Sequence, residues 1–541
     1  MGITPKLPGD DGTSTSKRPH IAIIGAGAAG LCMAMRLKTA GFTSFVLYEA
    51  ADRLGGTWRA NTYPGAACDI PAHLYSFSFA PNPDWTRKFA PQPEIEAYLN
   101  RCADDHGLRA HIRFNTEICG AHFDAATDCW RLEIVGGSEE LAHFLVCACG
   151  QLNRPHIPNF NGRMAFKGSQ FHSARWPRDA RVNGTIVAVI GSAATAIQIV
   201  PEIAPQASRV LVFQRASNWI ARKRDRAYST FERMLYKRLP VMLRLVRSYH
   251  FWRHELRYLT FRQHSLMSFV YHAILKARVR RKQRDPTLRV AVTPDYPVGC
   301  KRVLFSNDWF QTLERPNVEL VTSPIEGFTS TAIETADGRT HPVDTVIYAT
   351  GFETTRYLAP MQIMGANGLT IEEVWSEGAR AHRGMTVAGF PNLFMLNGPT
   401  TNLAHNSVQF MVECQVRYII SCIESVIDRG AATLAVKPDQ MAASNKRLRR
   451  RLSGSVWAAG CSNWYKNTNG LITNNWSGPA FRYWLETRRV DLDELSRRAP
   501  GLHFSKPPQY TQQRWAHCCQ SSNEPCLSAR ANFIRLSFDG A

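Results

Sequence analysis

The sequence has few of the features that mark membrane-spanning, exported or disulfide-rich proteins. It contains no uncharged apolar run of about 18 residues, the length that a transmembrane helix needs. The N-terminal segment MGITPKLPGDDGTSTSKRPH has no apolar core like that of a secretory signal. The fourteen cysteines form neither a CxxC pair nor a regular ladder, which favours buried thiols in a reducing compartment. These absences predict a cytoplasmic protein, and no metal site is expected.

Acidic residues are also scarce, since 44 Asp and Glu stand against 65 Lys and Arg, a formal net charge of +21. Most of the excess lies in residues 221–290, where 19 Lys and Arg accompany only four acids, a balance of +15. The basic residues there are interleaved at roughly helical spacing with Leu235, Leu239, Leu243, Leu245, Phe251 and Trp252. We expect a helical insertion with a solvated basic face. Peripheral contact with an anionic membrane stays open, and no nucleic-acid partner is expected.

A glycine-rich turn near the N-terminus predicts a dinucleotide site. It follows an apolar run at 21–24 and has the pattern GxGxxG, formed by Gly25, Gly27 and Gly30. The glycines allow a tight turn, close approach of the backbone to a pyrophosphate, and close packing of helix on strand. A second strand ends at Glu49, nineteen residues after Gly30, where a carboxylate can bind ribose hydroxyls.

A second turn of the same kind follows a predicted strand at 185–190. Alanines take the second and third glycine positions, so that the turn consists of Gly191, Ser192, Ala193, Ala194, Thr195 and Ala196. The next strand, at 210–213, is followed by Arg215 instead of the acid typical of an NAD site. A cation there suits a 2′-phosphate, which favours NADPH over NADH. The alternative is an arginine on a solvated strand end.

The segment between the two turns contains FKGSQFHSARWP, from Phe166 to Pro177. Its characteristic positions are Phe166, Gly168, His172 and Trp176. This pattern, FxGxxxHxxxW between two Rossmann turns, resembles the fingerprint of Baeyer-Villiger monooxygenases. Related flavin-containing monooxygenases that oxidise nitrogen or sulfur end the motif with Tyr or Phe, so Trp176 favours the ketone-oxidising branch.

Further motifs carry the same resemblance from about residue 20 to residue 490. The stretch Gly56, Thr57 and Trp58 completes a GGTW segment that favours FAD at the first site. The other matching motifs are Cys68-Asp69, Lys301-Arg302, the ATG turn at 349–351 and the HNS at 405–407. Ala67 stands where an arginine often precedes the Cys-Asp pair, so the surroundings of Asp69 differ from those of the best-known members.

The resemblance implies a function and roles for several residues. FAD and NADPH would serve a monooxygenase that inserts oxygen from O2 into a small apolar ketone, through a flavin peroxide, to give an ester or lactone. Oxidation of nitrogen or sulfur by the same architecture is the alternative. Arg302 matches the active-site arginine and Asp69 the acid that orients it. Lys301 and Arg215 match positions that bind the 2′-phosphate, and His172 is interpreted as a residue that positions the cofactor and holds the two domains in register.

The predicted fold is α/β, with two Rossmann-like dinucleotide-binding domains and a helical insertion in the NADP domain. The oligomeric state stays open. The expected segments are a flexible lead-in at 1–18, an FAD domain at 19–155 and 381–499, an NADP domain at 156–220 and 295–380, a basic helical insertion at 221–294, and a disordered tail at 500–541.

Overall fold

The computed structural model describes residues 19–461 and 463–498. The predicted lead-in at 1–18 and the predicted tail at 500–541 lie outside the described residues. Within the described part, no helix combines the length and the apolar character needed to cross a bilayer.

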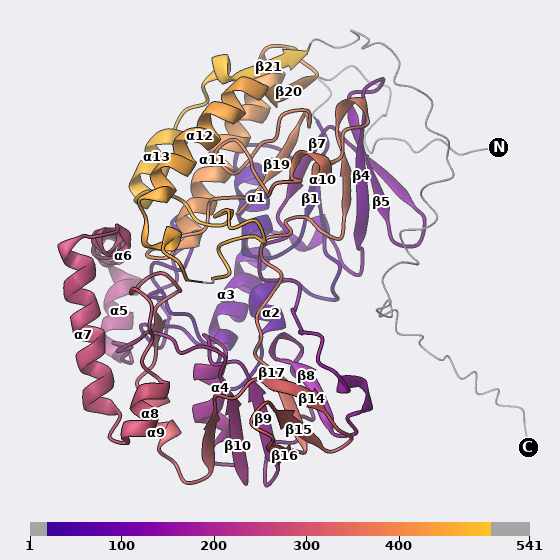
Figure 1. Ribbon diagram of the computed structural model, residues 1–541. Helices are drawn as coiled ribbons and strands as arrows, with labels where there is room; N and C mark the ends of the chain where they lie inside the picture. Colours follow the sequence, from indigo (N-terminus) through magenta and orange to yellow (C-terminus); the bar gives the residue numbers. More distant parts are fainter. Residues whose placement is uncertain (1–18, 462, 499–541) are drawn as a thin grey trace, which may run out of the picture. The chain divides into compact units, whose positions relative to one another are not determined.

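The first nucleotide turn belongs to a five-stranded sheet in which all neighbouring strands are parallel (Figure 1). Its order is β19 (Leu393–Met395), β7 (Phe144–Cys147), β1 (Ile21–Ile24), β2 (Phe45–Tyr48) and β3 (Ile112–Arg113). The residues of β1 and β7 are all buried, which explains their continuous apolar sequence, because a parallel sheet is covered on both faces. Helices α1 (Ala28–Thr39), α3 (Gln92–Asp105) and α11 (Val408–Asp428) contribute to the same core.

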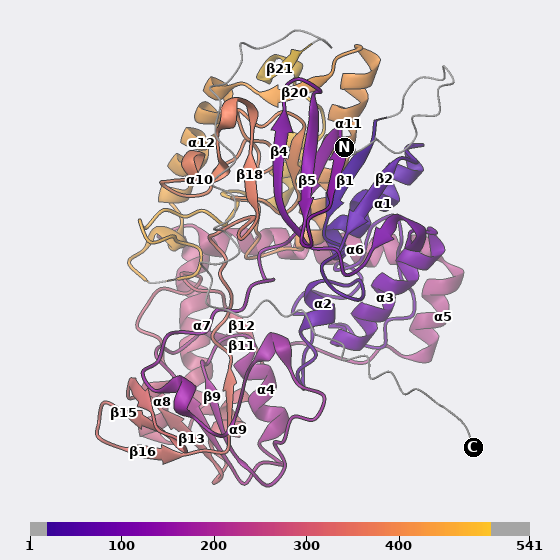
Figure 2. The ribbon, with the colours of Figure 1, turned by 90° about the vertical axis from the view of Figure 1, so that its right-hand side faces the viewer.

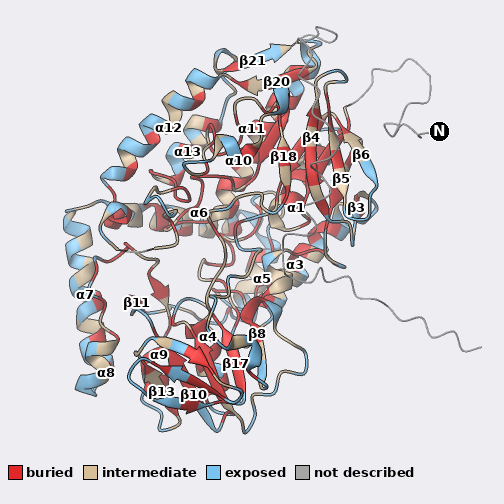
Figure 3. Cartoon of the chain, turned by 45° about the vertical axis from the view of Figure 1, so that its right-hand side comes forward, coloured by how far each residue is buried: buried red, intermediate tan, exposed pale blue. Residues whose placement is uncertain are grey.

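The second nucleotide turn belongs to another five-stranded parallel sheet. Its order is β13 (Val318–Val321), β10 (Arg209–Phe213), β9 (Ile186–Ile190), β17 (Thr345–Tyr348) and β8 (Ser169–His172). Helices α4 (Ala196–Ile203) and α9 (Trp309–Leu313) pack in its core. Figure 3 shows the strands of this sheet as largely buried. Strand β8 places His172 of the FxGxxxHxxxW pattern on the edge of this sheet.

A third sheet joins segments that lie far apart in the sequence. Strand β18 (Gln362–Met364) pairs in parallel with β4 (Ile118–Asp124), which continues to β5 (Cys129–Ile134) and β6 (Glu139–Ala142). Figure 2 shows β18 beside β4 despite their separation in the sequence. Residues 362–364 therefore pair with a strand of the predicted segment 19–155, although the sequence predicted that the chain returns to that domain at residue 381.

Residues 221–294 contain four α helices and a short 3₁₀ turn. They are α5 (Thr230–Arg238), α6 (Pro240–Leu256), η4 (Arg257–Phe261), α7 (Leu266–Lys282) and α8 (Pro286–Ala291). A capping box starts α5, since the Ser229 hydroxyl accepts from the Glu232 amide while the Glu232 carboxylate accepts from the Ser229 amide. The carboxylate of Glu255 in α6 accepts from the backbone amides of Ala480 and Phe481, at 3.1 Å each. The insertion is thereby joined to the start of α13 (Ala480–Thr487).

The remaining elements are short or peripheral to the two nucleotide turns. They are α2 (Thr57–Ala60), α10 (Ile371–Val374), α12 (Pro438–Ser453), β11 (Ile220–Ala221), β12 (Leu304–Phe305), β14 (Ile325–Phe328), β15 (Ala332–Thr335), β16 (Thr340–Pro342), β20 (Thr433–Val436) and β21 (Leu495–Arg498).

Candidate active site

The first glycine turn is shaped so that only glycine fits it. Gly25 adopts φ of +104°, and a Cβ on Gly30 would lie 2.0 Å from the Gly25 carbonyl oxygen. A Cβ on Gly56 would lie 3.0 Å from the Cα of Gly27, so the GGTW loop passes directly against the turn. The backbone is therefore bare at the N-terminus of α1, where amides can bind a pyrophosphate.

Glu49 follows β2 and holds the same turn in place. Its Oε2 accepts from the amide of Ala26 at 2.8 Å, and its Oε1 accepts from the amide of Ala51 at 3.0 Å. A carboxylate has about four lone-pair sites, so two bonds leave capacity for ribose hydroxyls. Nearby, the Trp58 indole donates to the Tyr75 hydroxyl at 3.0 Å, and Thr57 begins α2. These residues fit an extended dinucleotide that carries a ribose and a pyrophosphate.

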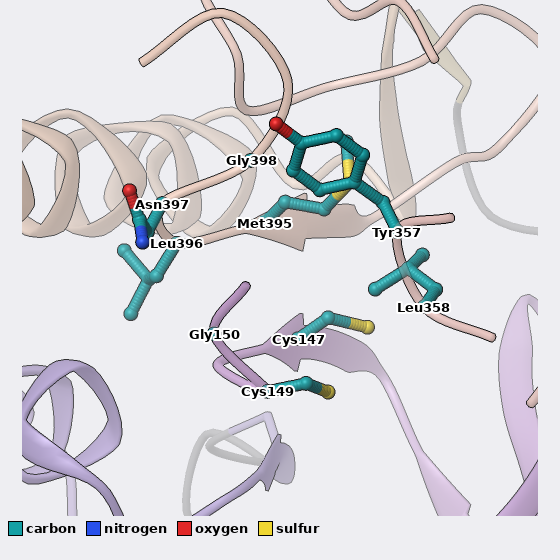
Figure 4. A pocket seen from close by; sticks show the side chains of 9 residues that line it. All are labelled: Cys147, Cys149, Gly150, Tyr357, Leu358, Met395, Leu396, Asn397 and Gly398. Atoms are coloured by element: carbon teal, nitrogen blue, oxygen red, sulfur yellow. The ribbon is translucent and has the colours of Figure 1, made fainter. Parts of the chain in front are cut away.

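A small pocket opens beside this turn, at the carboxyl ends of β7 and β19 (Figure 4). It is lined by Cys147, Cys149, Gly150, Tyr357, Leu358, Met395, Leu396, Asn397 and Gly398. The carboxyl ends of parallel strands are where open α/β sheets bind ligands. The Tyr357 hydroxyl accepts from the Gln151 amide at 2.9 Å and donates to the Asn474 amide oxygen at 3.0 Å, so this side chain is fixed.

The second glycine turn is more open than the first. Gly191 adopts φ of +114°, and its amide donates to the Phe213 carbonyl at 2.9 Å. The Ser192 hydroxyl donates to the Ala216 carbonyl at 3.2 Å, while Thr195 directly precedes α4. Ala193, at the second glycine position, is exposed, so its methyl group meets no packed neighbour that would forbid it.

Two cations stand beside this second turn. Arg215 is exposed just beyond the end of β10, and the Lys301 ammonium lies 4.7 Å from the centroid of the Tyr296 ring. Burial, and then the positive charge of Arg215, lower the pKa of Lys301. Two cations that repel each other would both be stabilised by an anion placed between them.

Asp69 and Arg302, from the two nucleotide domains, form a bidentate ion pair. The Arg302 Nη2 lies 2.6 Å from Oδ2 and 2.8 Å from Oδ1 of Asp69, and the Arg302 Nε lies 3.2 Å from Oδ2. The negative charge of Asp69 raises the pKa of Arg302 above its ordinary range. Arg302 is therefore a permanent cation whose guanidinium plane is fixed by the carboxylate.

Neutral buried groups surround this pair. Burial raises the pKa of Cys68 to about 12 and that of Tyr465 to about 12. Neither side chain carries charge near neutral pH, so the thiol and the phenol add no charge to the ion pair. An oxygen that gains negative charge here would therefore be stabilised mainly by Arg302.

Sequence reasoning missed a set of contacts between the loop before Asp69 and helix α4. The Tyr63 hydroxyl donates to the Gln198 amide oxygen at 3.0 Å, and the Gln198 amide nitrogen donates to the Ala67 carbonyl at 3.0 Å. A Cβ on Gly65 would lie 2.6 Å from the Gln198 carbonyl oxygen. The Tyr-Pro-Gly turn was the available signal, since a conformation with positive φ and no room for a side chain requires glycine.

A disulfide next to the ion pair corrects the expectation of free thiols. Cys300 is bonded to Cys461, 161 residues away in the sequence, and the Asn463 side chain donates to the Cys300 carbonyl at 3.1 Å. Eight further cysteines among the described residues have free thiols: Cys32, Cys68, Cys102, Cys129, Cys147, Cys149, Cys414 and Cys422. The pairing was not visible in the sequence because no spacing rule links two cysteines so far apart. It ties the Lys301-Arg302 segment to the aromatic-rich C-terminal part of the chain.

The FxGxxxHxxxW residues hold the second sheet together. Phe166 packs on Phe328 with ring centroids 6.0 Å apart, and a Cβ on Gly168 would lie 2.4 Å from the Asp344 carbonyl oxygen. Trp176 packs edge-on against Phe171 at 5.1 Å. Within the part of the chain that the structure describes, no hydrogen bond, ion pair or ring contact joins these residues to the Asp69–Arg302 pair.

His172 is a buried, neutral imidazole. Its Nδ1 accepts from the Ala174 amide at 3.1 Å, so Nε2 carries the proton that is donated to the Gly351 carbonyl at 2.9 Å. Burial lowers the pKa of His172 to about 4. The imidazole thus links β8 to the turn after β17 and carries no charge near neutral pH.

Comparison with known proteins agrees with this geometry. Residues 17–358 match the flavin-binding monooxygenase-like family. A Baeyer-Villiger monooxygenase from Streptomyces coelicolor is 40% identical over 484 residues, which cover 89% of this chain and 93% of that protein. The solved structure of an oxidized steroid monooxygenase bound to NADP is 30% identical, with a TM-score of 0.80 over 89% of this chain and 99% of the other. The solved OTEMO complex with FAD and NADP is 26% identical, with a TM-score of 0.81 over 89% of this chain and 100% of the other.

The observations agree on one family. The structure has two parallel sheets of the nucleotide-binding type and a glycine turn braced by Glu49, and the chain is similar to flavin monooxygenases in sequence and structure. The predicted α/β fold with two Rossmann-like domains is confirmed. The chain belongs to the flavin-binding monooxygenase-like family, in its Baeyer-Villiger monooxygenase group, and is an FAD-dependent oxidoreductase that uses oxygen and an organic substrate.

Proposed function

We propose that this enzyme uses NADPH and O2 to insert one oxygen atom beside the carbonyl of an apolar ketone, which gives an ester or lactone. The observation that carries the proposal is the bidentate Asp69–Arg302 pair, which fixes the Arg302 cation where the two nucleotide-binding domains meet. Related proteins support it, because a steroid monooxygenase was solved with NADP and OTEMO with FAD and NADP. FAD supplies the activated oxygen when it is bound and reduced.

The first domain would hold FAD through its bare turn and Glu49. The glycine turn at 25–30 would bind the pyrophosphate, and the free lone pairs of Glu49 would bind the ribose. Gly56, Thr57 and Trp58 lie against that turn and would border the rest of the cofactor.

The second domain would hold NADPH through the turn at 191–196 and the two cations. Gly191, Ser192 and Thr195 would present backbone and hydroxyl groups to the pyrophosphate. Arg215 and Lys301 would bind the 2′-phosphate, whose negative charge would offset the repulsion between the two cations.

Arg302 would stabilise negative charge that develops on the reacting oxygen atoms, as oxyanion-hole donors do. Its bonds to Asp69 use Nε and Nη2, so Nη1 is the nitrogen that can face those atoms. Asp69 would act as a positioning residue that fixes the guanidinium plane. His172, neutral and fully bonded, would hold β8 and the turn at Gly351 in register and would transfer no proton.

The direct test is a substrate panel. The purified flavoprotein is supplied with NADPH and 18O2 and offered cyclic, aryl and long-chain ketones beside tertiary amines and sulfides. An ester or lactone that carries one 18O atom is expected. Formation of N-oxide or sulfoxide without any ester would contradict the proposal and favour heteroatom oxidation.

An Arg302→Ala variant tests the residue that carries the proposal. Ester formation should fall at least about 100-fold, as when a donor is removed from an oxyanion hole, while the bound flavin and its reduction by NADPH persist. The matched control is Arg131→Ala, since Arg131 pairs with Glu139 at 2.9 Å and with similar side-chain exposure, 31% against 29% for Arg302. Equal loss of ester in both variants, or retained ester formation in Arg302→Ala, would contradict the assigned role.

A further inference from the structure

Exposed apolar side chains are concentrated on the helical insertion. Of the 21 large apolar residues that are exposed in the described part of the chain, 14 lie between residues 231 and 274. A soluble monomer seldom exposes a contiguous apolar surface of this kind without an interaction that uses it.

Helix α6 exposes a row of large apolar side chains on its outward face. Five of its apolar side chains follow one another at helical spacing and are between 51% and 64% exposed. They are Val241, Leu245, Tyr249, Trp252 and Leu256. They form a single stripe along the helix, because residues three and four apart lie on one face.

The inward side of α6 mixes apolar and polar side chains. Leu243 is buried in the first core, and Met242 and Val246 pack against the same core. The guanidinium of Arg247 donates to the carbonyls of His73, at 3.0 Å, and Ser76, at 2.7 Å. His250 and His254 are buried, and burial lowers their pKa to about 4 and about 2. Helix α6 therefore exposes apolar side chains on its outward face in addition to those that it packs inward.

The outward stripe continues onto η4 and α7. Leu259 is exposed in η4, and the first half of α7 exposes Leu266, Met267, Phe269, Val270 and Ile274. The opposite face of α7 buries Leu275 and Val279 against the protein. Figure 3 shows α7 as mostly exposed or intermediate, and it runs along the left margin of the view in Figure 1. We call the outward apolar residues from Val241 to Ile274 the apolar stripe.

Basic residues border the apolar stripe. Arg244 and Arg262 are exposed beside it, and α7 ends in the exposed cations Arg280, Arg281 and Lys282. Within residues 19–461 and 463–498, no ion pair is formed by any of these five side chains. The segment 221–290 has a balance of +15, so anions are the complementary partners.

We infer that the apolar stripe and its basic border dock on the surface of an anionic lipid bilayer. Leucine and aromatic side chains on one side of a helix enter the boundary between headgroups and acyl chains, while neighbouring arginines and lysines bind lipid phosphates. Association with a second copy through this face fits less well, since it would bring two segments of the same positive charge together.

Vesicle co-sedimentation of the flavin-loaded enzyme tests the inference. Binding to vesicles with about 30% phosphatidylglycerol in phosphatidylcholine should exceed binding to phosphatidylcholine alone, and should weaken as salt rises. The triple variant Leu245→Ser, Leu256→Ser, Phe269→Ser should bind at least about tenfold more weakly. The triple variant Arg280→Gln, Arg281→Gln, Lys282→Gln should lose most of the preference for anionic vesicles.

The matched control replaces exposed apolar residues outside the insertion, in the variant Val135→Ser, Met164→Ser, Ile427→Ser. It should bind vesicles as the parent does, and all variants should retain their flavin, which reports folding. Equal vesicle binding by the parent and the apolar-stripe variant would overturn the inference. So would light scattering that shows a dimer abolished by that variant, or tighter binding to nucleic acid than to anionic vesicles.

Discussion

The two nucleotide turns have the same topology but differ in how closely they are packed. In the first turn, Gly30 has no room for a methyl group, and the GGTW loop lies against Gly27. In the second, Ala196 is fully buried with its methyl group in place, and Ala193 is exposed with no loop packed over it. A turn that is covered suits a cofactor that stays bound, whereas an open turn suits one that enters and leaves in each catalytic cycle.

Among changes in the two turns, the largest effect is expected from Gly30→Ala. The new Cβ would lie 2.0 Å from the Gly25 carbonyl oxygen. Gly25 cannot easily move away, because its φ of +104° lies in a region that only glycine adopts readily. Overpacking of this kind costs about 1–3 kcal/mol, so FAD affinity should fall about 5-fold to 150-fold. The measurement is the flavin-to-protein absorbance ratio after desalting. The control is the reverse change in the other turn, Ala196→Gly, which should lower the free energy of unfolding by about 1 kcal/mol without loss of flavin. Full flavin content in Gly30→Ala would show that the first turn has room for a methyl group at this position.

A smaller effect is expected from Arg215→Gln in the open turn. Loss of a charge-assisted bond to the 2′-phosphate should lower kcat/KM for NADPH about tenfold and leave kcat/KM for NADH unchanged. Arg209→Gln is the matched control, since Arg209 lies at the other end of the same strand and pairs with Glu319. A similar fall with NADH and NADPH would mean that Arg215 does not contact the 2′-phosphate.

The pH dependence of NADPH binding should report the two cations. Because the pKa of Lys301 is lowered, its charge is lost at a lower pH than that of an ordinary lysine, and the KM for NADPH should rise with it. Arg215→Gln removes the repulsion, so this rise should move to higher pH, and Lys301→Arg should abolish it. A profile that is unaffected by both variants would contradict a shared phosphate site.

The smallest effect is expected from Ala193→Gly, which restores the second glycine of the turn. The exposed methyl group obstructs little, so the dissociation constant for NADP should improve no more than about threefold. A gain of a hundredfold, measured by fluorescence titration, would show that Ala193 limits access to the site.

Local sequence was sufficient to predict the parts of the fold that depend on neighbouring residues. The turns at Gly25 and Gly191 and the acid at Glu49 follow directly from strand, turn and helix signals within about 30 residues. The resemblance also led us to expect Asp69 beside Arg302, and the two side chains form an ion pair in the structure. The roles of these residues stay predictions.

Contacts between distant segments could not be read from the sequence. The Cys300–Cys461 bond, the contact of Gln198 with Ala67, and the pairing of β18 with β4 each join residues that are more than 100 positions apart. The apolar stripe on the outward face of α6 was missed for the same reason. Helical spacing shows that a stripe exists, but only the packed fold shows which way it faces.

The hydrogen bonds of the Glu255 carboxylate make the folding of the insertion depend on a segment that is synthesised much later. Its two backbone donors, Ala480 and Phe481, are translated 225 and 226 residues later. On the ribosome, the insertion therefore emerges with an acid whose amide partners do not yet exist. A nascent chain that stops before Ala480 cannot complete this contact, so the insertion reaches its final hydrogen-bonded state only when the last described helix has been made.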